Sequence, residues 1–150
     1  PYPGGPRLDK LAQEGNPHAF KLPEARVDGY NFSFSGLKTA VLRLVKSFDG
    51  QELPEKDICA SFQETVSSTL LHKLKKALDE SGYNQVVIAG GVAANSEIRK
   101  KIFNLSNEGC KVFAPPMKYC TDNAAMVASC AYFNTNTFDD INTEVFSRVN

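Results

Sequence analysis

A short apolar run that ends in two glycines and leads into a helix is the feature that most limits the fold of this chain. It lies in the segment QVVIAGGVAANSEIR, residues 85–99. The run at 86–88 predicts a buried strand, because β-branched residues suit a pleated sheet and the run is too short for a helix. Gly90 and Gly91 leave the backbone bare at the end of that strand, where a ligand could contact it. Asn95 stands where a helix would begin, and its side chain could cap the helix or bind a ligand.

This segment has two interpretations. It is either an ordinary tight connection between a strand and a helix or part of a ligand site, because ligands of open α/β sheets bind in the crevice beyond the carboxyl ends of the strands. Short glycine motifs occur too often by chance to choose between the two.

Elsewhere the apolar residues alternate between helical and extended spacing. The opening PYPGGP predicts a turn, and the polar stretch at 134–142 has no clear period. The order of elements predicts an α/β domain in which helices cover a sheet. Helices are expected at 7–14, 37–48, 55–81, 96–106 and 121–133, and strands at 31–34, 86–88 and 111–113.

A second segment with chemical content is KYCTDNAAM, residues 118–126. Thr121 or Asp122 would cap the last helix, and either could do so without any further function. Alternatively, Asp122 follows a second strand much as Asn95 follows the first, and consecutive loops of a parallel sheet open on the same edge. Its carboxylate could then bind a metal or a phosphate-bound cation.

A third segment is NFSFSGLKT, residues 31–39. Ser35 could cap the helix that follows, and Gly36 permits close approach. Lys38 places a cation in the first turn, where the helix dipole disfavours it, so it could serve an anion such as phosphate or an RNA backbone. A solvated surface lysine is the alternative. The two histidines, His18 and His72, have no ligand-spaced partners and are expected to be structural or surface residues.

The composition argues against several classes of partner but does not identify the function. Lys+Arg and Asp+Glu both total 17, so a net charge of zero does not favour a nucleic acid or a membrane as partner. No apolar run approaches the roughly 20 residues of a membrane span. The four cysteines contain no CxxC pair, which indicates reduced and mostly buried thiols in a cytosolic protein.

Five motifs occur along the chain in this order: PYPGGPRLDKLAQEG, FSFSGLKTA, ASFQETV, VVIAGGVAANSEIR and YCTDNAAM. Together they resemble the TsaD family, which makes threonylcarbamoyladenosine in tRNA and was formerly described as an O-sialoglycoprotein endopeptidase. The resemblance covers about residues 1–134 and the carboxyl half of such a protein. It implies the second lobe of a two-lobed actin-like ATPase fold, shared with sugar kinases and Hsp70. On this basis residues 1–150 form a single domain of a longer protein, with a poorly structured tail at 135–150.

The resemblance also implies a reaction and site residues. Threonylcarbamoyl-AMP binds between the lobes beside an iron or zinc ion, the N6 amine of adenosine 37 in ANN-decoding tRNAs attacks the carbamoyl carbon, and AMP leaves. Threonylcarbamoyl-AMP or ATP is thus the expected nucleotide ligand. Nucleotide contacts fall on Gly5 and Asn95, with Gly90 and Gly91 in the same pocket by proximity. The family's metal-binding aspartate falls on Asp122.

Part of the family's site is missing from this sequence. The family takes two further metal ligands from an H-x-x-x-H pair in its amino half, and no such pair occurs here. One carboxylate does not hold a transition metal ion tightly. We therefore expect the 150 residues alone to lack transferase activity, to bind metal weakly or not at all, and to self-associate through exposed apolar surface.

Two other function classes are weighed against the transferase. A non-catalytic actin-like scaffold that binds nucleotide would suit a protein without the missing histidines. A metalloprotease finds neither an H-E-x-x-H helix nor a nucleophile beside a base. The resemblance implies tRNA, a TsaB-like paralogue and a TsaE-like ATPase as partners. It implies a cytoplasmic protein with no membrane partner. Lys38 is a candidate contact to RNA or phosphate.

Overall fold

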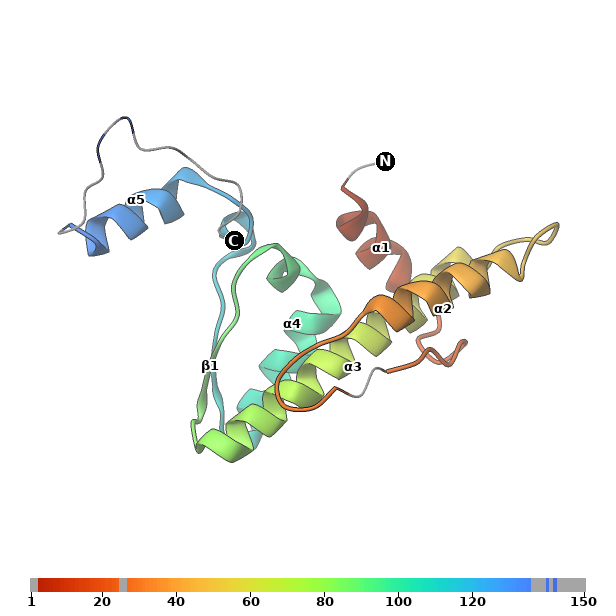
Figure 1. The fold of residues 1–150 in the computed structure, drawn as a ribbon, viewed down its shortest axis with the longest axis horizontal. Helices are drawn as coiled ribbons and strands as arrows, with labels where there is room; N and C mark the ends of the chain where they lie inside the picture. Colours follow the sequence, from red (N-terminus) through yellow and green to blue (C-terminus); the bar gives the residue numbers. More distant parts are fainter. Residues whose placement is uncertain (1–2, 25–26, 136–139, 141, 143–150) are drawn as a thin grey trace.

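One long helix, α3 (Glu55–Ser81), forms the axis of the structure, a computed structural model that describes residues 3–24, 27–135, 140 and 142 (Figure 1). Pro54 precedes its first turn, in which Glu55 and Asp57 place negative charge at the positive end of the helix dipole. Gly82 ends the helix with a φ of 71°, a left-handed conformation that glycine adopts at little cost. The predicted bounds of this helix are confirmed.

A strand–helix–strand unit packs against the carboxyl-terminal half of α3. Its two strands are parallel, with Val86 opposite Val112. The strand at 111–113 is confirmed, the first strand is shifted by one residue, and the helix expected at 96–106 changes to a 3-10 turn after Phe103. The unit consists of β1 (Gln85–Val87), η1 (Gly91–Ala94), α4 (Ser96–Phe103), η2 (Asn104–Glu108) and β2 (Lys111–Phe113).

The apolar core lies where α4 and α3 cover one face of this sheet, which confirms the predicted α/β class. Val87 and Phe113 belong to the other face, because successive side chains alternate along a strand, and there they are 73% and 51% exposed. The centre of the core consists of Val86, Ile98, Ile102 and Leu105, with Leu70, Leu71, Leu74, Leu78, Ile88, Cys110 and Val112 packed against it.

Small polar residues occupy most of the buried positions of α3. Large apolar residues recur at helical spacing along α3, and of these only Ile58 is buried, while the others are half-buried: Phe62, Val66, Leu70, Leu74 and Leu78. Elements pack on α3 from more than one side, and small residues allow their close approach. Their hydroxyl groups are satisfied locally, as when Thr65 Oγ1 donates to the carbonyl of Ser61 at 2.8 Å. The buried polar residues are Ser61, Gln63, Thr65, Ser67 and Thr69.

Helix α1 (Gly4–Ala12) crosses the amino-terminal part of α3 (Figure 1). The prediction of a turn at PYPGGP is wrong for residues 3–6, because helix α1 begins there. Pro3 is the N-cap residue, and Pro6 falls in the first turn, where a missing N–H breaks no helical hydrogen bond.

The loop after α1 is fastened to α3. The backbone N–H of Asn16 donates to Asp57 Oδ1 at 2.8 Å, and that of Phe20 donates to Ser61 Oγ at 3.1 Å. Gly15 lies so near α3 that a β-carbon on it would come within 2.1 Å of the Lys56 carbonyl oxygen. Only glycine therefore fits here without a backbone shift.

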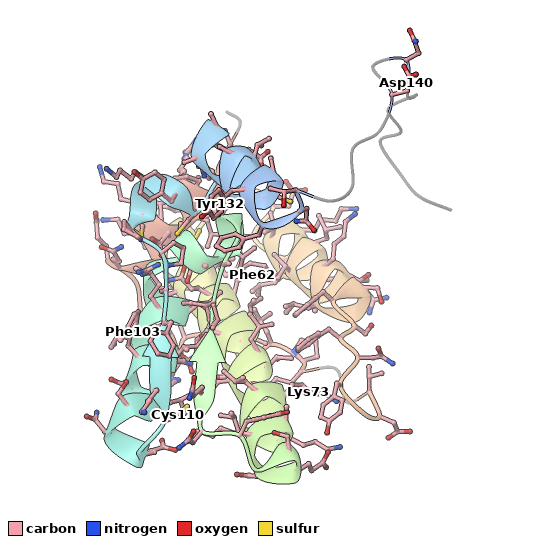
Figure 2. All side chains as sticks on the ribbon, turned by 90° about the vertical axis from the view of Figure 1, so that its left-hand side faces the viewer. Phe62, Lys73, Phe103, Cys110, Tyr132 and Asp140 are labelled. Carbon is pink, nitrogen blue, oxygen red and sulfur yellow. The ribbon has the colours of Figure 1, made fainter. Side chains whose placement is uncertain are left out.

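Helix α2 (Ser35–Lys46) runs beside α3 (Figure 1). The strand predicted at 31–34 is wrong, because no other strand pairs with this segment in the described part of the chain. Instead the rings of Phe32 and Phe34 stack with their centroids 6.0 Å apart. Lys73 of α3, labelled in Figure 2, reaches the loop that precedes α2, where it donates a hydrogen bond to the Gly29 carbonyl at 2.7 Å.

Helix α5 (Ala124–Phe133) follows η3 (Met117–Tyr119) and stands apart from α3 (Figure 1). Every residue of α5 is exposed and none is charged. Tyr132 and Phe133 are 73% and 78% exposed. Such a concentration of exposed apolar side chains is typical of an interaction surface.

All four cysteines are free, as expected for reduced thiols. The expectation that they are mostly buried is wrong, since only Cys120 is buried and Cys130 is exposed. His18 and His72 are exposed, as expected for surface residues. No helix in the described ranges is long and apolar enough to cross a membrane. The tail predicted at 135–150 lies almost entirely outside the described residues.

Candidate functional site

A mainly apolar cavity of about 530 Å³ lies between α1, α3 and the loop that follows β1. It has one aromatic wall, Phe62, and three polar side chains, those of Asp9, Gln63 and Asn95. We refer to it as the apolar cavity. Its lining consists of Gly5, Pro6, Leu8, Asp9, Phe62, Gln63, Val66, Gly91, Val92, Ala94, Asn95, Ile98 and Met117.

Three of the six residues proposed from the sequence meet in this cavity. Gly5 comes from the first turn of α1, Gly91 opens η1, and Asn95 immediately precedes α4. Gly90, Lys38 and Asp122 do not line it. The fold thus joins the YPGGP and GGVAAN segments in one place, although some 85 positions separate them in the sequence.

The glycines of the site have different structural reasons. A β-carbon on Gly5 or Gly91 would meet no atom within 4 Å, so neither glycine is required by packing in this chain. Both leave backbone exposed at the cavity. Gly90 has a φ of 83°, which a side chain would strain, and its role here is to turn the chain from β1 into η1.

Asn95 caps α4, which confirms one of the two roles expected for it. Its Oδ1 accepts a hydrogen bond from the backbone N–H of Ile98 at 3.0 Å. Its Nδ2 donates to Asp9 Oδ1 at 3.2 Å and to Gln63 Oε1 at 2.8 Å. One side chain therefore joins the start of α4 to α1 and α3 beside the cavity.

Asp9 completes this junction. Its carboxylate accepts hydrogen bonds from the backbone N–H and the hydroxyl of Ser96, the latter at 2.7 Å. A carboxylate at the first turn of α4 also interacts favourably with the helix dipole. Asp9 is thus a second cap of α4, supplied from another helix.

Arg99 connects the two loops that follow the strands. Its guanidinium donates to the carbonyl of Ala93 at 3.0 Å and to that of Pro115 at 3.3 Å. The prediction that both loops open on the same edge of the sheet is confirmed by these contacts. The second loop reaches the apolar cavity through Met117 rather than through Asp122.

Asp122 lies in the exposed turn before α5. The prediction that Thr121 or Asp122 caps this helix is wrong. The cap is Asn123, whose Oδ1 accepts from the N–H of Met126 at 2.9 Å, because α5 begins later than the sequence indicated. Within the described ranges no three His, Cys, Asp or Glu side chains are placed to hold a metal ion together. These residues therefore do not make a complete metal site.

Lys38 is exposed and borders a separate apolar groove of about 380 Å³ between α2 and α3. The groove shares Phe62 and Val66 with the apolar cavity, so the two are neighbours. Ser35 does not cap α2 as predicted. It is the first residue of the helix, and the N-cap position falls on Phe34.

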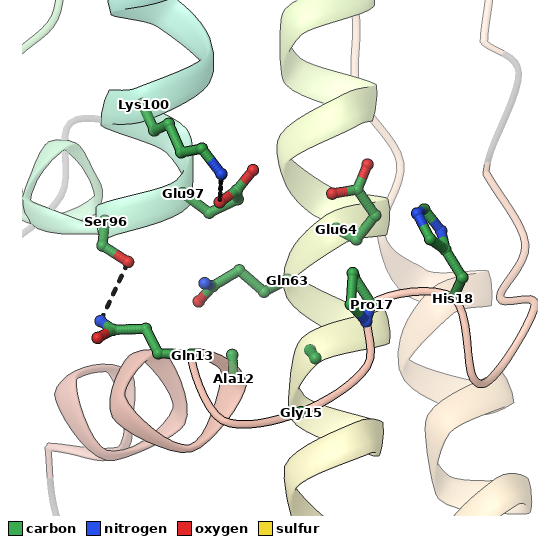
Figure 3. A pocket seen from close by; sticks show the side chains of 11 residues that line it. Ala12, Gln13, Gly15, Pro17, His18, Gln63, Glu64, Ser96, Glu97 and Lys100 are labelled. Atoms are coloured by element: carbon green, nitrogen blue, oxygen red, sulfur yellow. Dashed lines mark hydrogen bonds and ion pairs between the residues drawn. The ribbon is translucent and has the colours of Figure 1, made fainter.

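A second cavity, also of about 530 Å³, lies on the other side of Gln63 and is polar (Figure 3). We call it the polar cavity. Glu97 and Lys100 form an ion pair of 3.5 Å on its α4 side, and Glu64 and His18 lie across from them. Its remaining lining residues are Ala12, Gln13, Gly15, Pro17, Ala60, Gln63 and Ser96.

Glu64 is held by Lys101 at 2.6 Å and by the Ser68 hydroxyl at 2.8 Å. Burial acts to raise the pKa of Glu64, but the hydrogen bonds from Lys101 and Ser68 and the positive charges of Lys101 and His18 outweigh it. The pKa of Glu64 consequently lies below its ordinary value.

Sequence reasoning missed Asp9, Gln63 and Arg99. All three lie inside motifs already singled out: Asp9 in PYPGGPRLDKLAQEG, Gln63 in ASFQETV and Arg99 at the end of VVIAGGVAANSEIR. Nothing local distinguishes Asp9 from the other charged residues of α1. Its partners are more than 80 positions away, and only the fold brings them together.

Comparisons with known proteins agree on one family. The model of the TsaD family, described as tRNA N6-adenosine threonylcarbamoyltransferase, matches residues 1–129. A protein of that name from Christiangramia forsetii is 53% identical over 139 residues, which cover 88% of this chain and 41% of the relative. Another from Thermosipho melanesiensis is 47% identical over 152 residues, covering 99% and 46%. The chain therefore spans less than half the length of these curated relatives.

A solved structure shares the fold. The crystal structure of T. kodakarensis HypF aligns with a TM-score of 0.64 over 89% of this chain and 17% of that one, at 23% sequence identity. At this identity the similarity concerns the fold alone.

Proposed function

Because this chain belongs to the TsaD family of tRNA N6-adenosine threonylcarbamoyltransferases, we propose that its apolar cavity binds the nucleoside part of an adenylate. The meeting of Gly5, Gly91 and Asn95 in that cavity carries the proposal. The lining contains no lysine, arginine or histidine, so it suits a base and ribose better than a phosphate group. Phe62 offers an aromatic face against which a base can stack.

In the whole protein the reaction is transfer of a threonylcarbamoyl group from threonylcarbamoyl-AMP to N6 of adenosine 37 in tRNA. The amine forms a bond to the carbamoyl carbon and loses a proton, the bond from that carbon to the phosphate oxygen breaks, and AMP leaves. The part we assign to this chain is to hold AMP while the bond breaks. We further propose that the chain is the second lobe of an actin-like ATPase fold.

A metal ion, iron or zinc, remains part of the proposal only for a longer protein. Asp122 would contribute one carboxylate, and the other ligands would come from residues outside these 150. The described residues alone do not form a complete metal site. Zinc titrated into the 150-residue chain is expected to show no submicromolar site, and a calorimetric isotherm with such a site would contradict this expectation.

We also propose tRNA, a TsaB-like paralogue and a TsaE-like ATPase as partners of the whole protein, and the cytoplasm as its location. Lys38 stays a proposed contact to RNA or phosphate, supported by its exposure beside the groove next to the apolar cavity. With a net charge of zero, this chain alone offers little of the phosphate attraction that dominates tRNA affinity.

The nucleoside cavity is tested by calorimetric titration of AMP into the 150-residue chain. Gly5→Val fills open space at the cavity wall and is expected to weaken binding at least about 10-fold, because displaced ligand contacts of about 1.4 kcal/mol correspond to that factor. Gly4→Val is the matched control, since Gly4 lies in the same turn, also faces open space, and does not line the cavity. Equal binding by both variants, or no binding by the unmodified chain, would refute the proposal.

An actin-like scaffold without catalysis would also bind AMP, so a second experiment separates it from a transferase. A family-length protein that carries this sequence is assayed for formation of threonylcarbamoyladenosine in tRNA, with and without Asp122→Ala. Loss of product with retained AMP binding is expected for the transferase. If the unmodified protein forms no product in the presence of its proposed partners, the transferase proposal is wrong and the non-catalytic scaffold is the remaining function.

A further inference from the structure

The side-chain amide of Gln63 has an orientation that its neighbours fix. The backbone N–H of Ile98 can only donate, so the side-chain atom of Asn95 that it contacts at 3.0 Å is the oxygen. The nitrogen of Asn95 donates to Gln63 at 2.8 Å, so the Gln63 atom on that side is its oxygen. The amide nitrogen of Gln63 therefore faces away from Asn95, which lines only the apolar cavity.

This nitrogen opens onto the polar cavity. Figure 3 shows the side chain of Gln63 extending from α3 into the space between Gln13 and Glu97, two residues that line only the polar cavity. No described residue accepts a hydrogen bond from the nitrogen, although Gln63 is only 7% exposed. Within the described ranges no unpaired side-chain polar atom is cut off from solvent, so the nitrogen is accessible from the cavity.

A buried amide with unused protons is costly unless a partner binds it. The oxygen of Gln63 already accepts from Asn95, and the nitrogen can only donate. The partner in the polar cavity therefore presents a hydrogen-bond acceptor.

Two opposite charges stand beside this donor. Glu97 and Lys100 are 3.5 Å apart, a long ion pair, and Glu97 Oε1 has no partner among the described residues. The Glu97 side chain is only 24% exposed, so its carboxylate is partly withdrawn from water. The charge of Glu64 is matched by Lys101 at 2.6 Å. With the exposed His18 neutral, the cavity therefore carries separated charges of both signs and no net charge.

We propose that the polar cavity is a second ligand site, which binds a free α-amino acid. The carboxylate of the amino acid accepts from Gln63 Nε2 on the side of Lys100, and its ammonium group donates to Glu97 Oε1. The cavity volume of about 530 Å³ lies in the usual range for small-molecule sites. This site goes beyond the proposed function and does not depend on it.

Other ligand classes fit these groups less well. A phosphate or a nucleotide would bring net negative charge close to the carboxylates of Glu97 and Glu64. A metal ion would have no use for the donor of Gln63. An uncharged polyol would satisfy that donor, but it would not use the charges of Glu97 and Lys100, and hydrogen bonds to charged groups are the stronger ones.

The test is a titration of the 15N-labelled 150-residue chain with the standard free amino acids, one at a time. At least one of them is expected to shift the side-chain amide signals of Gln63 and the backbone signals of the lining residues in a saturable way. Its carboxamide lacks the carboxylate, and its N-acetyl derivative lacks the ammonium charge. Each should bind at least about 10-fold more weakly, because each loses a hydrogen bond that involves a charged group.

Two variants test the residues of the site. Gln63→Glu keeps an oxygen for Asn95 but replaces the donor with a negative charge, and it should weaken binding at least about 10-fold. Lys100→Met should weaken it about 2- to 5-fold, as expected for an exposed charge. Lys76→Met is the matched control and should bind like the unmodified chain, because Lys76 forms an exposed helical ion pair of 3.6 Å and lines neither cavity.

If Gln63→Glu does not fold, the two derivatives and Lys100→Met decide. No binding of any standard amino acid, equal binding of both derivatives, or equal affinities of Lys100→Met and Lys76→Met would each overturn the site. Glycerol or glucose that binds as tightly as the best amino acid would also overturn it, since neither carries a charge. None of these results touches the nucleoside cavity, whose own test measures AMP binding in variants at Gly5 and Gly4.

Discussion

The side-chain amide of Asn95 donates a hydrogen bond of 3.2 Å to the carboxylate of Asp9, 86 positions earlier in the chain. The same carboxylate accepts from the N–H and hydroxyl of Ser96. α1 and α4 are therefore fixed relative to each other by one acidic residue, and the walls of the apolar cavity are fixed with them.

Asp9→Ala is expected to lower the free energy of unfolding by about 2 kcal/mol, because it leaves the donors of Asn95 and Ser96 without their charged acceptor. Urea denaturation followed by circular dichroism measures the loss. Lys10→Ala, an exposed neighbour on the same helix, is the control and should change stability by less than about 0.5 kcal/mol. Equal stability of the two variants would show that the junction contributes nothing.

Gly15→Ala is expected to destabilise the chain by about 1–3 kcal/mol or more, since its β-carbon would lie 2.1 Å from the Lys56 carbonyl oxygen and force α1 away from α3. Gly36→Ala in α2 meets open space and should leave stability unchanged or raise it by up to about 1 kcal/mol. Thermal unfolding of both variants tests the contrast in sign, and a Gly15→Ala variant as stable as the unmodified chain would contradict the close packing.

Local sequence patterns predicted the elements whose ends carry their own signals. The bounds of α3 were predictable because Pro54 precedes the helix and Gly82 ends it, and those of β2 because Pro115 and Pro116 follow the strand closely. The segment at 31–34 has the alternation of a strand, yet it forms none, because a strand also needs a partner that a local pattern does not reveal.

The candidate site was predictable only in its pieces. Gly5, Gly91 and Asn95 were marked by their motifs, and the fold brings them to one cavity. The roles of Asp9 and Gln63 depend on contacts across 86 and 32 positions, which no periodicity encodes. The cap of α5 was predicted wrongly for a local reason. Three adjacent residues, Thr121, Asp122 and Asn123, can all cap a helix, and only the position at which the helix begins decides among them.

The ion pair of Glu64 with Lys101 gives the chain a pH dependence of known sign. The folded pKa of Glu64 lies below its ordinary value of 4.5, so the carboxylate stabilises the fold above that pH. The contribution is lost as the pH falls through the lower, folded pKa. Glu64→Gln should therefore cost about 1–2 kcal/mol at pH 7 and progressively less below pH 4.5.

Urea denaturation of Glu64→Gln and of the unmodified chain at several pH values between neutrality and acid measures this difference. Glu52→Gln is the control, because Glu52 is exposed and forms no ion pair within the described ranges. A cost for Glu64→Gln that stays constant down to the most acidic pH would show that the charge of Glu64 is not the source of its contribution.

Helix α5 is expected to drive self-association of the isolated chain. Its ten residues carry no charge and all are exposed, with Val127 at 62%, so contact between copies would remove apolar surface from water at roughly 25 cal/mol per Å². Sedimentation velocity over a range of concentrations should show the unmodified chain associating and Val127→Lys shifted toward monomer. Leu42→Lys places the same charge at a residue of α2 that is 53% exposed, and it should leave association unchanged. Association weakened equally by both substitutions would mean that added charge, and not the surface of α5, controls it.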